Sequence, residues 1–240
     1  MSTAGVRDDP EHAKVHDWRA FCPSVDPERI LRIHGYKDPR RIRPVLRRTA
    51  EDVARRITGI AEPEARWSWR EVASLDAEGV ELAGGIAFRC EAFQRLLAGA
   101  DRVIAFVLTL GPRFDQTVSG LFGVDSNPLE GLFLETAGWL AVERLTRELA
   151  AHLRAEAGAD GRVIGHRMGP GYSYAVGDRA AGRRVFWPLD QQHDLFRIFD
   201  GAKLPVALLD SAAMQPRMSR SGLFAVLPAD APTTGAAGKR

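Results

Sequence analysis

An arginine placed just before a rigid turn is the feature of this chain with the clearest chemical potential. Residues 165–172 read Gly-His-Arg-Met-Gly-Pro-Gly-Tyr. Pro170 fixes its own φ and Gly171 can adopt a positive φ, so the backbone can bend sharply and bring amide groups close to a bound molecule. The guanidinium of Arg167 matches a carboxylate, and Tyr172 adds an apolar face with a polar tip. The pattern indicates a carboxylate-binding turn; a tight turn with a surface arginine is the alternative.

A second candidate is the carboxylate of Glu143. An Asn-Pro pair begins a predicted helix over residues 128–156, and helical spacing places Glu143 on its apolar face. A carboxylate on such a face is costly unless it is paired. Arg147, one turn later, would supply an i,i+4 ion pair, whereas the functional alternative is a cationic group of a ligand. The sequence leaves both alternatives open.

The other reactive side chains give weaker evidence for a catalytic or metal-binding role. His166 invites interpretation as a metal ligand or a general base, but a histidine beside a turn more often forms hydrogen bonds or lies at the surface. Met214 and Met218 are expected to pack in the core or at its rim. Cys22 and Cys90 lack a Cys-x-x-Cys spacing, so we expect neither an iron–sulfur nor a zinc site, and we assign no catalytic or metal-binding residue.

The elements that must position these residues mix helix and strand irregularly. Helices are predicted near residues 27–34, 40–60, 89–98, 112–122, 128–156 and 188–199. Strands are predicted at 66–75 and 80–82 as a hairpin, at 103–108 as a buried central strand, and at 162–165, 206–209 and 222–227. Because these elements do not form βαβ units, we expect an α+β fold with a mixed, largely antiparallel twisted sheet and packed helices. Neither a Walker loop nor a Gly-x-Ser-x-Gly elbow occurs, which disfavours nucleotide-phosphate enzymes and hydrolases.

Length and composition suit one globular domain between two tails. The 240 residues are 45% hydrophobic and 27% charged, which is ordinary for a folded protein. Residues 1–24 and 229–240 are rich in small, charged, Pro and Gly residues without periodicity, so we expect disordered tails. The domain is expected to span residues 25–228.

Charge and cysteine content constrain location and partners. The net charge is only +2, and the locally basic segment 40–48 is typical of a solvated helix face, so we expect no nucleic-acid partner. The apolar runs are too short for a signal peptide or a membrane span. Two cysteines without a disulfide pattern favour a reducing compartment. We therefore expect a soluble, cytoplasmic protein.

Several segments, in order, resemble the free-standing form of the activation (reactivation) domain of vitamin B12-dependent methionine synthase. The resemblance covers residues 26–228 and implies a methionine synthase activation domain-like fold. The segments that carry it are 31–36 (Leu-Arg-Ile-His-Gly-Tyr), 106–112, 141–143 (Ala-Val-Glu), 167–172, 186–199 and 208–222.

The resemblance implies a binding site for S-adenosylmethionine, held by a glutamate and the Arg-x-x-Pro-Gly-Tyr segment. Carried over position by position, Arg167 would take the methionyl carboxylate and Glu143 would face the ammonium group. Gly169 and Gly171 would offer backbone contacts, and Tyr172 would pack on the ligand.

Two positions depart from the family pattern. Gly169 replaces an alanine before Pro-Gly, and Phe224 replaces a tyrosine shortly after a Ser-Gly pair. The lost hydroxyl weakens the case for a ligand contact from Phe224. An acidic ligand residue near the start of the family's domain has no counterpart that can be placed here.

The implied function is that of a methyltransferase component, active only with partner chains. It would bind S-adenosylmethionine within a split cobalamin-dependent methionine synthase and support reductive methylation of cob(II)alamin. The cobalamin would be carried by a partner chain, a methionine synthase chain or another corrinoid protein, and a flavodoxin or ferredoxin would donate the electron. The alternatives are a non-catalytic S-adenosylmethionine-binding or corrinoid-capping module, and an activator of another corrinoid methyltransferase.

Overall fold

The computed structural model describes residues 14–19, 24–123, 127–176 and 182–229. Within these ranges one sheet has the strand order β4-β3-β2-β5-β11-β6, and β1 pairs with β2 as well. Every pairing in it is antiparallel, which confirms the predicted α+β class with a largely antiparallel sheet. The strands are β1 (Val15–Arg19), β2 (Glu64–Leu75), β3 (Gly79–Leu82), β4 (Ile86–Arg89), β5 (Arg102–Thr109), β6 (Arg162–Met168) and β11 (Ser219–Pro228).

The sheet is covered on both faces, which explains the unbroken apolar run of β5. Successive side chains of a strand point to opposite faces, so a strand buried on both sides is apolar throughout. Ile104, Phe106 and Leu108 join the core that includes α5, whereas Val103, Ala105 and Val107 join the core on the other face.

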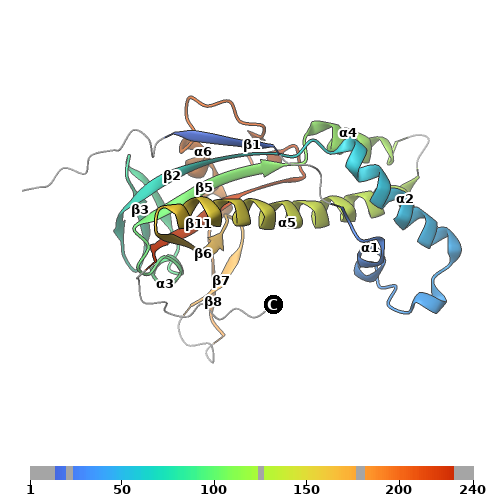
Figure 1. Ribbon diagram of the computed structural model, residues 1–240, viewed down its shortest axis with the longest axis horizontal. Coiled ribbons are helices and arrows are strands. Elements are labelled where there is room, and N and C mark those ends of the chain that lie inside the picture. Colours follow the sequence, from blue (N-terminus) through green and yellow to red (C-terminus); the bar gives the residue numbers. More distant parts are fainter. Residues whose placement is uncertain (1–13, 20–23, 124–126, 177–181, 230–240) are drawn as a thin grey trace, which may run out of the picture.

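The helices are α1 (Pro27–Ile33), α2 (Pro44–Ile60), α3 (Phe93–Leu96), α4 (Pro112–Gly120), α5 (Pro128–Ala159) and α6 (Gln192–Arg197), with short 3₁₀ turns η1 (Pro39–Arg41) and η3 (Leu189–Gln191). One half of α5 crosses the sheet, and the other half extends past the sheet to α1, α2 and α4 (Figure 1). The long helix therefore joins the sheet to a helical lobe.

Helix starts follow the predicted capping chemistry. The Asp26 side chain accepts a hydrogen bond from the amide of Glu28 over 2.9 Å, and the Asn127 side chain accepts one from the amide of Glu130 over 3.3 Å. Helix α2 begins at Pro44 rather than at the predicted residue 40. The residue before a proline avoids helical geometry, so the helix cannot continue back through Arg43.

One tail prediction and two strand predictions need correction. Val15–Arg19 lies in the predicted N-terminal tail but forms β1, because its backbone pairs with β2. Residues 86–89, for which we predicted no strand, form β4 and extend the predicted hairpin to three strands. Residues 206–209 do not complete the large sheet: β9 (Ala207–Leu208) pairs with β10 (Met214–Gln215) in a separate sheet.

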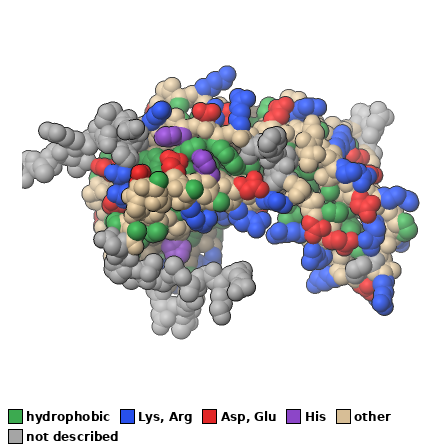
Figure 2. Space-filling model, viewed as in Figure 1, with side chains coloured by type: hydrophobic (Ala, Val, Ile, Leu, Met, Phe, Trp, Pro, Cys, Tyr) green, Lys and Arg blue, Asp and Glu red, His purple; other side chains and the backbone are tan. Residues whose placement is uncertain are grey.

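Acidic and basic side chains are interspersed over the helical lobe in the view of Figure 2, where α1 and α2 carry both signs. The ion pairs Arg47–Glu28 and Arg32–Asp26 are examples. Among the described residues, no helix combines the length and the apolar character that crossing a bilayer requires.

Candidate ligand-binding site

The predicted turn lies where β6 ends against β11. Phe224 of β11 faces Arg167 of β6 in the strand register, and Leu223 faces Met168. The strands approach closely because residue 222 has no side chain: a Cβ on Gly222 would lie 2.1 Å from the Met168 carbonyl oxygen. The Ser-Gly pair of β11 therefore fixes how closely the turn approaches the sheet.

The backbone bends at the turn as the sequence predicts. Gly171 has a φ of +81°, and its amide donates to the Trp187 carbonyl over 2.8 Å. The Trp187 amide in turn donates to the Tyr172 carbonyl over 3.0 Å, and the Trp187 side chain is fully buried. The turn is thereby anchored beside the hairpin of β7 (Ser173–Ala175) and β8 (Arg184–Phe186).

The hydroxyl of Tyr174 holds the start of the turn. It accepts a hydrogen bond from the Gly169 amide over 2.7 Å and donates one to the Gly169 carbonyl over 3.1 Å. Burial raises the pKa of Tyr174 above its ordinary value, so the hydroxyl stays protonated and able to donate. The amides of Gly169 and Gly171 thus both have partners within the protein. A Cβ on Gly169 would lie 3.0 Å from the Ser221 carbonyl oxygen, so the absence of a side chain at Gly169 lets the turn approach β11 closely.

Two adjoining cavities open at the turn. Their volumes are about 100 and 270 Å³, and together they lie at the lower end of the range of roughly 300–1,000 Å³ typical of small-molecule sites. Tyr172, Arg220 and Ser221 line both. The smaller is also lined by Arg167, Met168, Gly169, Ser173 and Tyr174, and the larger by Trp139, Pro170, Gln192, Ala213, Met214, Arg217 and Ser219.

Glu143 joins this site through Arg220. The Arg220 Nη1 donates to Glu143 Oε2 over 2.5 Å and to Thr146 Oγ1 over 3.2 Å. Arg220, not the predicted Arg147, is therefore the hydrogen-bonded partner of Glu143. Burial raises the pKa of Glu143, but the hydrogen bond and charge of Arg220 outweigh that effect and leave the pKa below its ordinary value.

Arg167 lies at the surface end of the same cluster. Partial burial and the charge of Arg220 lower the pKa of Arg167, while the charge of Glu143 opposes that shift. Arg167 keeps its proton, because guanidinium is charged at any physiological pH. Two cations on neighbouring strands therefore line one cavity, which favours binding of an anion between them.

Sequence reasoning missed Arg220, Gln192 and Trp139. Gln192 is buried and donates to the Ala212 carbonyl over 2.6 Å, while its own carbonyl accepts from the Ser221 hydroxyl over 2.8 Å. Trp139 is 54% exposed at the mouth of the larger cavity. Of these three, only Arg220 could have been found from the sequence. Side chains alternate along a strand, so Arg220 and Phe224 share one apolar face, where a cation needs a carboxylate partner.

Of the remaining sequence candidates, only Met214 lines a cavity at the turn. Phe224 is buried and stacks on Phe106 with ring centroids 4.8 Å apart, so its ring belongs to the core. Met218 is buried and Met214 is half-buried at the rim, as predicted. Burial and the charge of Arg95 lower the pKa of His166, which does not line either cavity.

One of the two cysteines lies within the described residues. Cys90 is buried with a free thiol, and burial raises its pKa; Cys22 lies outside the described residues. Among the residues that the structure describes, no cluster of histidine, cysteine, aspartate and glutamate side chains could hold a metal ion.

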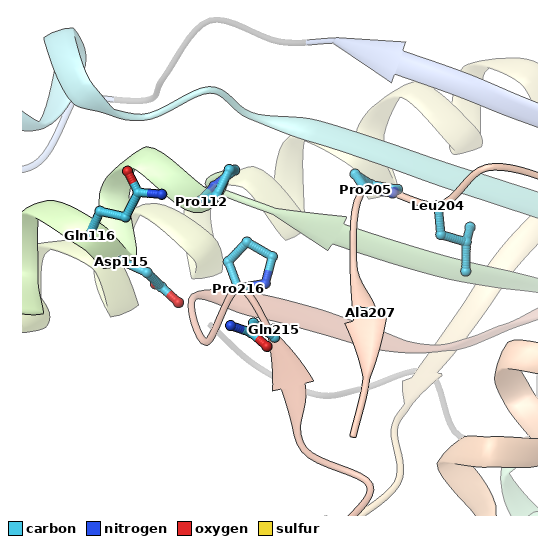
Figure 3. Close-up of a pocket in the computed structure, with 8 residues that line it drawn as sticks. All are labelled: Pro112, Asp115, Gln116, Leu204, Pro205, Ala207, Gln215 and Pro216. Carbon is cyan, nitrogen blue, oxygen red and sulfur yellow. The ribbon is translucent and has the colours of Figure 1, made fainter. Parts of the chain in front are cut away.

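A third cavity, of about 360 Å³, lies between α4 and the segment around β9 and β10 (Figure 3). Pro112, Pro205 and Pro216 are part of its wall, and Asp115 is its charged residue. That carboxylate already accepts hydrogen bonds from the amides of Arg217 and Met218. The cavity is larger than either cavity at the turn, but its one charge is used to hold the chain that enters β11.

No protein-family model and no curated protein matches the sequence. Among solved structures, a crystal structure of the MetH reactivation domain bound to AdoHcy aligns with a TM-score of 0.57 and 15% sequence identity. The alignment covers 90% of this chain and 79% of that chain. The chain has the fold of the MetH reactivation domain. At this identity the likeness establishes the fold, and the site must be argued from its own residues.

Proposed function

We propose that this protein binds S-adenosylmethionine and serves as the reactivation component of a split cobalamin-dependent methionine synthase in the cytoplasm. The observation that carries the proposal is that Arg167, Gly169 and Tyr172 line one cavity, in a fold whose solved relative holds AdoHcy. Three residues chosen from a linear motif are thus neighbours around a space that a ligand can enter.

The side chains around the cavities fit the chemical groups of S-adenosylmethionine. Arg167 offers paired donors for a carboxylate. Glu143 lines neither cavity, but its ion pair with Arg220 places a carboxylate beside them, which would face an ammonium group. Tyr172 and Trp139 offer aromatic faces to the apolar parts of the ligand. The site therefore combines an anion contact and a stacking surface, with one carboxylate beside them.

The reaction would be completed on a partner chain. An external donor would supply one electron to cob(II)alamin on the partner, and the methyl group would move from the sulfonium to the reduced cobalt, leaving S-adenosylhomocysteine. In this protein, Arg167 would anchor the ligand's carboxylate so that the sulfonium end is held in a constant place. Tyr172 and Trp139 are 46% and 54% exposed, which leaves an open side that a partner could cover.

A ligand-binding module without methyl transfer is the second candidate. The pairing of Glu143 with Arg220 favours it, because the carboxylate expected to meet an ammonium group already has a cationic partner. Phe224, which replaces the family's tyrosine, is buried in the core and offers no ligand contact. A role with another corrinoid methyltransferase would leave the binding site unchanged.

Titration calorimetry with S-adenosylmethionine tests the proposal directly. We expect saturable heat from the purified chain and a rise in its unfolding temperature with ligand concentration, because a ligand that binds only the folded state stabilises it. If millimolar ligand produces no heat and no thermal shift, the proposal loses its basis.

A further inference from the structure

Arg220 is a cation inside the sheet. It is 8% exposed, and its strand β11 lies between β5 and β6. A buried charge is costly without a partner, and Glu143 and Thr146 supply partners from α5. A role restricted to core packing would require the rest of the guanidinium to be enclosed.

The rest of the guanidinium is open to the ligand cavities. Within the described part of the chain, both side-chain hydrogen bonds of Arg220 leave from Nη1. Among the described residues, Nε and Nη2 have no such partner, and neither of them is fully buried. Arg220 also lines both cavities. Their N–H groups are therefore directed to space that a ligand can occupy.

The charges around the cavities leave an excess of one positive charge. Arg167 and Arg220 line the smaller cavity as two cations, and Glu143, which is paired with Arg220 and lines neither cavity, contributes one anion. Arg217 also lines the larger cavity, but Glu135 balances it across 3.6 Å.

We propose that Arg220 contacts the ligand and binds the ligand's carboxylate together with Arg167. The charge of Arg220 then makes the site favour the neutral thioether S-adenosylhomocysteine over the cationic sulfonium S-adenosylmethionine. The two ligands differ at sulfur by a methyl group and one positive charge. A like charge within the same site disfavours the sulfonium form. S-adenosylhomocysteine, the product left after methyl transfer, would then be retained in the site. This inference rests on the proposed function.

The experiment compares the two ligands by titration calorimetry in the wild-type chain and in Arg220→Gln. Glutamine keeps a donor for Glu143 and removes the charge. Arg144→Gln is the matched control, because it also removes one arginine charge and Arg144 is the next residue after Glu143. Arg144 donates hydrogen bonds to Glu148 and Ser24 and lines neither cavity. We expect wild type to bind the thioether more tightly, and Arg220→Gln to reduce that preference about five- to tenfold. Arg144→Gln should leave the preference unchanged.

The outcomes separate the inference from the function beneath it. If both ligands bind and Arg220→Gln leaves their affinity ratio unchanged, the inference is wrong while the proposed binding function holds. If neither ligand binds wild type, the proposed function itself fails. Should circular dichroism show that Arg220→Gln is unfolded, Glu143→Gln replaces it. That variant leaves Arg220 unopposed and should increase the preference for the thioether, and a decrease would overturn the inference.

Discussion

Arg220 on β11 and Glu143 on α5 join the sheet to its covering helix, with Nη1 of the arginine 2.5 Å from Oε2 of the glutamate. The same arginine lines both cavities at the turn. One ion pair therefore contributes both to the packing of α5 on the sheet and to the charge of the ligand site. Changes at either residue should alter stability and binding together.

The stability of the chain should fall at acidic pH partly through Glu143. Its pKa in the folded state lies below the ordinary value of 4.5, so its stabilising contribution is present above that value and is lost as pH falls through the folded pKa. The carboxylate side chain is 40% exposed, so solvent screening keeps the effect modest. Urea unfolding from pH 7 to pH 3 should show the difference between wild type and Glu143→Gln shrinking below about pH 4.5. A difference independent of pH would contradict the assignment.

Arg167→Ala should weaken binding of S-adenosylmethionine about ten- to a hundredfold, since a charge-assisted hydrogen bond contributes about 1.5–3 kcal/mol. Calorimetry of the folded variant measures the loss. Arg197→Ala is a suitable control, because that exposed arginine of α6 pairs with Asp194 and does not line the cavities. Equal affinity in wild type and Arg167→Ala would exclude Arg167 as a ligand contact.

Gly222→Ala should destabilise the fold by about 2–3 kcal/mol, because the added Cβ would collide with the Met168 carbonyl and push β11 away from β6. Gly59→Ala on the exposed side of α2 has no atom within 4 Å of the added Cβ. It should be neutral or stabilise the chain by about 0.5–1 kcal/mol. Denaturant unfolding of the two variants distinguishes a collision from a general intolerance of alanine.

Much of the fold could be predicted because local signals and burial agree. Proline and a capping side chain set the starts of α1 and α5, and the apolar run of β5 marked the central strand. The sequence did not predict β1 or the separation of β9. Both depend on which distant strand completes the hydrogen bonds, and a five-residue or two-residue segment carries little information about its partner.

The site was predictable where the motif is continuous in sequence. Arg167, Gly169 and Tyr172 line one cavity because the proline and glycine of the same segment shape the turn. The partner of Glu143 was not predictable by helical spacing, which points to Arg147. Arg220 lies 77 residues away and meets the glutamate only through the packing of α5 on the sheet.

The isolated chain should not take up cobalamin. Its sequence has no Asp-x-His-x-x-Gly segment of the kind that binds cobalamin, so the proposed function assigns the corrinoid to another chain. Mixing the protein with cobalamin and passing it through a desalting column should leave the protein fraction colourless. Adding a cobalamin-loaded corrinoid protein should instead give a complex, detectable by a change in sedimentation. Tight retention of cobalamin by the chain alone would contradict this division of labour.

Reactivation should require an electron donor that the chain does not contain. An iron–sulfur cluster generally needs four thiolates, whereas the sequence has two cysteines and Cys90 is buried with a raised pKa. No flavin-binding fingerprint occurs in the sequence either. In omission assays that follow cob(II)alamin absorbance, we expect methylation only when the corrinoid partner, S-adenosylmethionine and a flavodoxin or ferredoxin are all present with this chain. Methylcobalamin formation without an external reductant, or iron and acid-labile sulfide in the pure protein, would show instead that the chain carries its own reducing centre.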